Sequence, residues 1–135
     1  MITSVILVLK LIIALGLLNV WVMRFNKPTQ YRGGDSNNMR EEFDSYGFPG
    51  SFMYAIGSFK CILALLLLCS VLSSFVDVPF LNSIDFNQIE LIGLYLLSII
   101  MLGAILVHIK LKDPAMKSLP AVLILAMSSL VIYFS

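Results

Sequence analysis

Four long runs of apolar residues constrain this chain more than any other feature of its sequence. They cover approximately residues 2–23, 50–75, 89–108 and 119–134. A helix needs about 20 apolar residues to cross the hydrocarbon core of a bilayer, and each run meets or approaches that length. Only 13% of the 135 residues are charged, against roughly 25% in soluble domains, so a chain of this size could not hide its apolar surface from water. The sequence predicts an all-α integral membrane four-helix bundle, with residues 1–135 forming one domain.

Basic residues are unequally distributed among the segments that connect these runs. Seven of them lie in residues 24–50 and 110–118, at Arg24, Lys27, Arg32, Arg40, Lys110, Lys112 and Lys117. The N-terminus, residues 76–88 and the C-terminus contain none. Because cytoplasmic loops of membrane proteins are enriched in Lys and Arg, we expect the first and third loops in the cytoplasm and both termini outside.

The polar loop 24–49 shows a helical pattern of its own. Asn38 followed by Glu41 matches the spacing of a capping box, and Gly47 can end the helix that it begins. Apolar side chains recur at helical spacing between these signals, at Met39, Phe43 and Tyr46. We expect a short amphipathic helix that lies at the cytoplasmic interface of the membrane. The pair Gly33-Gly34 reads as a turn, because it lacks the strand and helix that flank a phosphate-binding loop.

Lys10 and Lys60 are the residues whose position is hardest to explain by structure alone. Both fall near the middle of an apolar run, with no acidic residue expected at the same depth. A lysine at the centre of a membrane helix costs about 2.5–3.5 kcal/mol on insertion scales, so something must offset that cost. Three offsets are open: neutral lysines, a carboxylate from Glu41, Glu42 or Glu90, and a bound ligand that carries an anionic or carbonyl group. We predict that Lys60 contacts Glu41 or Glu42.

The remaining polar residues allow both structural and functional interpretations. Glu41 and Glu42 are adjacent, so on a helix they diverge by about 100° and do not form a carboxylate dyad; they form a solvated face or pair with Arg24, Arg32 or Lys60. Trp21 and Arg24 are expected to form part of an interfacial belt.

His108 is the single histidine of the chain and lies close to Asp113 in the sequence. A metal site is not expected with one histidine, which leaves a proton-handling or capping role. No catalytic serine–histidine–acid set, haem ligand pair or CxxC motif is present, and a nucleic-acid partner is not expected because membrane topology explains the basic residues. No cofactor can be assigned.

Several short motifs together resemble the DoxX-like family of small four-helix membrane proteins. They are Asn19-Val-Trp21 with Arg24, the run from Lys27 through Tyr31 to Gly34, Glu41-Glu-Phe43, Tyr46-Gly-Phe-Pro49, Gly57-Ser-Phe-Lys60, Gly103-Ala104 with His108, Asp113-Pro114 and Pro120-Ala121. The resemblance covers nearly the whole chain and implies a four-helix bundle of a bacterial inner membrane. Its wider superfamily includes subunits linked to thiosulfate:quinone oxidation and the nicotinic-receptor assembly chaperone NACHO.

The sequence favours a non-catalytic, chaperone-like helper that contacts other membrane proteins through its helices. The alternative is an accessory subunit of a membrane oxidoreductase that binds a quinone, a lipid or another small molecule; a small transporter fits less well, because no broken helix is evident. The candidate ligand- or partner-binding residues are Lys60, Glu41, Glu42, Lys10, Arg24, Asn19, Arg32, Tyr31, His108 and Asp113.

Overall fold

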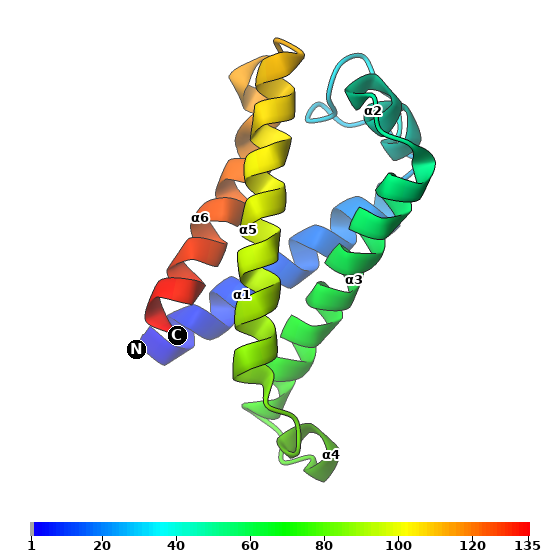
Figure 1. Ribbon diagram of the computed structural model, residues 1–135. Helices are drawn as coiled ribbons and strands as arrows, with labels where there is room; N and C mark the ends of the chain where they lie inside the picture. Colours follow the sequence, from blue (N-terminus) through cyan, green and yellow to red (C-terminus); the bar gives the residue numbers. More distant parts are fainter. Residues whose placement is uncertain (1) are drawn as a thin grey trace.

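The computed structural model describes residues 2–135 and is helical, without strands, over that range (Figure 1). Its long elements are α1 (Ile2–Leu18), which continues as a π-helix η1 (Asn19–Met23), α3 (Gly50–Ser73), α5 (Phe86–Lys110) and α6 (Leu119–Phe134). Within residues 2–135, four helices are long and apolar enough to cross a membrane. The predicted all-α four-helix architecture is confirmed, with α5 beginning three residues before the expected start.

Three short helices lie in the connections between the long ones. They are α2 (Met39–Tyr46), α4 (Pro79–Asn82) and the 3₁₀ turn η2 (Ala115–Ser118). The predicted signals of α2 are present, since the Asn38 side chain accepts the backbone N–H of Glu41 and Gly47 adopts a left-handed φ of 84°. This helix packs on α3; its position at the membrane interface stays a prediction.

The long helices form two pairs that separate toward one end of the bundle. The first helix packs on α3 and on α6, and α6 packs on α5. At the end near α4, the helices α3 and α5 approach closely, because a Cβ on Gly93 would lie 2.6 Å from a methyl carbon of Leu63. Toward the end that carries α2 they diverge, while both termini lie at the opposite end (Figure 1).

Two groups of buried apolar side chains hold the bundle together. The larger group joins α1, α3, α5 and α6 and includes Ile13, Leu67, Leu94 and Leu97. The smaller group joins η1, α2 and α3 through Trp21, Met39, Phe43 and Met53. The second group explains why an eight-residue helix that would be marginal alone is held in place.

Lys10 forms an ion pair inside the bundle. Its Nζ lies 2.8 Å from Glu90 Oε2 and 3.4 Å from Ser70 Oγ, so side chains of α1, α3 and α5 meet at one point. The expectation that no acidic residue lies at this depth is wrong for Lys10, whereas the option that Glu90 supplies the counter-charge is confirmed. Because α5 begins at Phe86, Glu90 lies one turn inside the helix rather than at its end.

Candidate ligand-binding cavity

A cavity of about 760 Å³ lies between the two helix pairs, toward the end that carries α2. Its volume falls in the range of roughly 300–1,000 Å³ that is typical of small-molecule sites. Most of its lining is apolar. Seven of the ten candidate residues line it, and these are Asn19, Arg24, Tyr31, Arg32, Glu42, Lys60 and His108. Three do not: Lys10 pairs with Glu90, Glu41 is exposed, and Asp113 lies behind His108.

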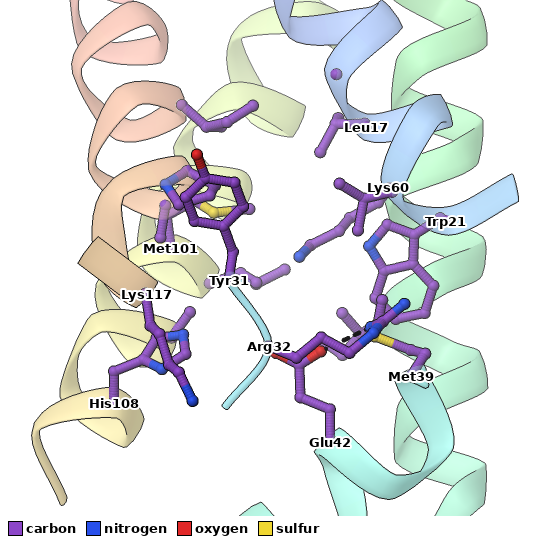
Figure 2. Close-up of a pocket in the computed structure, with 18 of the residues that line it drawn as sticks. Leu17, Trp21, Tyr31, Arg32, Met39, Glu42, Lys60, Met101, His108 and Lys117 are labelled. Atoms are coloured by element: carbon purple, nitrogen blue, oxygen red, sulfur yellow. Dashed lines mark hydrogen bonds and ion pairs between the residues drawn. The ribbon is translucent and has the colours of Figure 1, made fainter. Parts of the chain in front are cut away.

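Lys60 projects its ammonium group into this cavity (Figure 2). Only 9% of the residue is exposed, and Nζ lies 5.4 Å from the centre of the Trp21 ring, which is a cation–π distance. Among residues 2–135 the ammonium group has no hydrogen bond and no ion pair. The predicted contact with Glu41 or Glu42 is therefore wrong, because Glu42 is bound by Arg32 and Glu41 accepts the Asn37 backbone N–H at 3.2 Å.

Trp21 forms one wall of the cavity and is buried, so the expectation that it belongs to an interfacial belt is wrong. It lies in η1, and π-helical turns recur at functional sites of proteins. Its ring rests against Gly57, where an added Cβ would lie 2.5 Å from ring carbons Cε3 and Cζ3. A glycine one helical turn before Lys60 thus lets the indole approach α3 and meet the ammonium group.

This packing predicts the effect of Gly57→Ala. The new methyl group must displace the indole, and overpacking of this kind costs about 1–3 kcal/mol. Trp21 is the single tryptophan of the chain, so we expect its fluorescence maximum to shift and the melting temperature to fall. The matched control is Gly103→Ala on α5, where an added Cβ meets no atom within 4 Å. Equal spectra for Gly57→Ala and wild type would contradict the packing described.

Arg32 is buried and organises the loop that lines one end of the cavity. Its Nε donates to the Lys27 carbonyl oxygen at 2.9 Å, and Nη1 lies 2.9 Å from Glu42 Oε2. Nη2 donates to the carbonyl oxygens of Arg24 and Phe25. One planar guanidinium group therefore holds three backbone carbonyl groups and one carboxylate.

Glu42 is the second centre of this network. Its Oε1 accepts the Gly33 backbone N–H at 3.2 Å and the Tyr46 hydroxyl at 2.5 Å. Burial raises the pKa of Tyr46 well above its ordinary value, and the charge of Glu42 and the hydrogen bond to it raise the pKa further. Tyr46 therefore stays a protonated donor at any physiological pH.

His108 and Asp113 bind the other side of the same loop. His108 Nδ1 lies 2.8 Å from Asp113 Oδ2, and the Gly34 backbone N–H donates to both Asp113 oxygens, at 3.1 and 3.3 Å. Lys117 donates to the Gly34 carbonyl oxygen at 2.5 Å and lies 3.8 Å from Asp113. Gly34 has a φ of 60°, which favours glycine. The expected turn is present, and its peptide groups bind two carboxylates, which sequence reasoning missed.

The pKa of Asp113 gives this cluster a pH dependence. Burial alone would raise the pKa of this carboxyl group, but the hydrogen bonds from His108 and Gly34 and the charge of Lys117 outweigh burial and lower it below 3.8. A lowered pKa in the folded state adds stability that is present above the ordinary value and is lost as pH falls through the folded pKa. We expect Asp113→Asn to lower the melting temperature near neutral pH, and the difference from wild type to shrink in strong acid. A difference that does not depend on pH would contradict this.

One of three comparisons with known proteins found a match. A sequence model described as the DoxX-like family matches residues 8–131. The chain belongs to the DoxX-like family. No curated protein and no solved structure matched this DoxX-like chain. Membership of this family and four helices able to cross a membrane identify a multi-pass membrane protein.

Proposed function

We propose that this DoxX-like protein binds a lipid-soluble small molecule in its cavity, with an acceptor oxygen of the ligand at Lys60. The observation that carries the proposal is the ammonium group of Lys60, a residue that is 9% exposed; this group faces about 760 Å³ of open space without an ion pair or hydrogen bond within residues 2–135. A buried charge without a partner is costly, and a ligand oxygen would remove that cost.

The lining supports a ligand with an apolar body and an oxygen-bearing head. Apolar side chains from all four long helices surround the space, while Lys60 and Tyr31 reach into it from different walls (Figure 2). Both groups are hydrogen-bond donors. A quinone carbonyl group and an anionic lipid headgroup share the acceptor chemistry that such donors bind. With a quinone as the ligand, the protein would serve as a binding subunit for a membrane oxidoreductase.

The chaperone-like role that the sequence favours has less support. It predicts a closed core in which Lys60 pairs with a carboxylate of the loop, and neither feature is found within residues 2–135. Contact with other membrane proteins through the helices stays a prediction, and the experiment below has an outcome that would favour it.

We also propose that residues 24–49 and 110–118 face the cytoplasm of a bacterium. The support is the seven basic residues on that side and none on the other. A reporter enzyme that is active only outside the inner membrane should be active when fused to the C-terminus. Activity only after fusion within residues 111–118 would reverse the orientation.

Native mass spectrometry of protein extracted gently from its own membrane tests the binding proposal. We expect a stoichiometric adduct on the wild type that Lys60→Met loses, and the adduct mass distinguishes a quinone from a phospholipid. Lys110→Met is the matched control, because Lys110 is exposed and does not line the cavity. No adduct on the wild type, with a co-purifying membrane protein instead, would overturn the proposal in favour of the helper role.

A further inference from the structure

The loop segment Tyr31–Gly34, here called the strap, connects the two halves of the bundle at the end where they diverge. On one side, the Gly33 backbone N–H donates to Glu42 of α2. On the other, the next N–H, that of Gly34, donates to Asp113, and the Gly34 carbonyl group accepts from Lys117 of η2. Successive peptide groups therefore bind two carboxylates, that of Glu42, which lines the cavity, and that of Asp113, which lies behind the lining residue His108.

The two glycines are required by this geometry. A Cβ on Gly33 would lie 2.6 Å from a ring carbon of Tyr46, so the strap lies directly against α2. The left-handed φ of Gly34 turns the chain toward Asp113. The strap also carries Tyr31 and Arg32, which line the cavity, so its position fixes how that end is closed.

The exposed residues of the cavity lining are polar in the loop 24–49 and apolar on the long helices. Its exposed polar lining residues are Arg24 and Gln30, which belong to the same loop as the strap. Its exposed lining residues on the long helices are all apolar: Ile12, Val20, Phe52, Gly103 and Leu123. These positions lie on helices able to cross a membrane, so the exposed apolar lining is on the side of the bilayer, and the exposed polar lining is in the loop that contains the strap.

We propose that the strap seals the aqueous end of the cavity, so that the ligand reaches Lys60 sideways from the bilayer. This rests on the proposed function for the identity of a ligand but not for the seal itself. The two carboxylates hold the strap in place, and release of Gly34 from Asp113 and Lys117 would open the cavity to water. The ligand class that follows is a molecule resident in the membrane rather than one dissolved in the cytoplasm.

Thiol labelling in lipid nanodiscs tests the seal without any ligand. Cys61 and Cys69 are free thiols and are replaced by alanine, and Ala104→Cys places one reporter on the α5 wall of the cavity. The probes are a charged, water-soluble methanethiosulfonate and an uncharged, lipid-soluble maleimide. We expect the charged probe to react about tenfold faster when Asp113→Ala frees the strap, whereas the rate of the uncharged probe stays unchanged.

Two further variants keep the result interpretable. Asp35→Ala, next to the strap and exposed, is the matched control and should leave both rates unchanged. Lys117→Met, at a residue that also lines the cavity, removes the bond to the Gly34 carbonyl group and the charge near Asp113. It should raise the rate of the charged probe even where Asp113→Ala does not fold. The proposal is overturned if the charged probe already reacts fast with the intact strap, or if neither strap variant accelerates it. Because labelling needs no ligand, a failed adduct experiment and a failed seal are separate results.

Discussion

Lys10→Met is expected to lower the free energy of unfolding by about 3 kcal/mol, as removal of one partner of a buried ion pair commonly does. The loss comes from Glu90 rather than from the lysine. Glu90 is 4% exposed, its Oε2 binds Lys10, and its Oε1 is buried without a hydrogen-bond partner among the described residues. Without Lys10, the carboxylate must stay uncompensated or take up a proton, and either change weakens the junction of α1 and α5.

The double variant Lys10→Met/Glu90→Met separates a lost pair from lost packing. Replacement of both charges by apolar side chains of similar size is often neutral, so we expect the double variant to recover most of the lost stability. Denaturant unfolding in one detergent measures all variants, with exposed Lys110→Met as the control for a changed lysine. If the double variant loses as much free energy of unfolding as the two single variants Lys10→Met and Glu90→Met together, the broken ion pair is not the cause of the lost stability.

The architecture was predictable because hydrocarbon imposes length and polarity rules that are visible in the sequence. The four spans, the Asn38 cap and the Gly47 terminus of α2 are local signals, and all are present. Such patterns depend on neighbours three or four residues apart and need no knowledge of the tertiary structure.

The partners of the two lysines were less predictable, because they depend on competition between distant groups. Glu90 lies 80 residues from Lys10 in the sequence, and a start of α5 placed at residue 89 put it at the helix end. Glu42 lines the cavity as the prediction required. Its carboxylate is bound by Arg32, however, which also binds a carbonyl group of the loop in which Arg32 lies. No local sequence pattern predicts that Glu42 pairs with Arg32 rather than with Lys60.

For other site residues, the local sequence pattern predicted a role that differs from the one found in the structure. Trp21 has the position of a belt residue, and only the contact with Gly57 reveals why it is buried. Gly57 lies three residues before Lys60, a spacing that places both on one helix face, but that spacing does not show that Trp21 is the side chain that packs on the glycine. The contacts of Gly33 and Gly34 were hidden, because they are made by backbone groups of a turn.

Arg32→Met is expected to be as damaging as the loss of the Lys10 pair, on the order of 3 kcal/mol. It leaves the half-buried Glu42 without its ion pair and frees carbonyl groups of Lys27 and Phe25. Arg32→Lys should recover less than half of this loss, because an ammonium group cannot match a planar fork of five donors. Thermal unfolding measures the size of the effect.

Hydrogen exchange of the amides in residues 24–38 shows where the loss occurs. We expect faster exchange throughout this loop in Arg32→Met, because the guanidinium group is the point at which its carbonyl groups converge. Arg40→Met is the matched control: Arg40 is exposed and bonds only the Tyr54 hydroxyl, and surface changes of this kind usually stay within about 0.5 kcal/mol. If Arg32→Met and Arg40→Met behave alike, then Glu42 and the apolar contacts of α2 hold the loop without Arg32. In that case the end of the cavity is closed by packing rather than by charge.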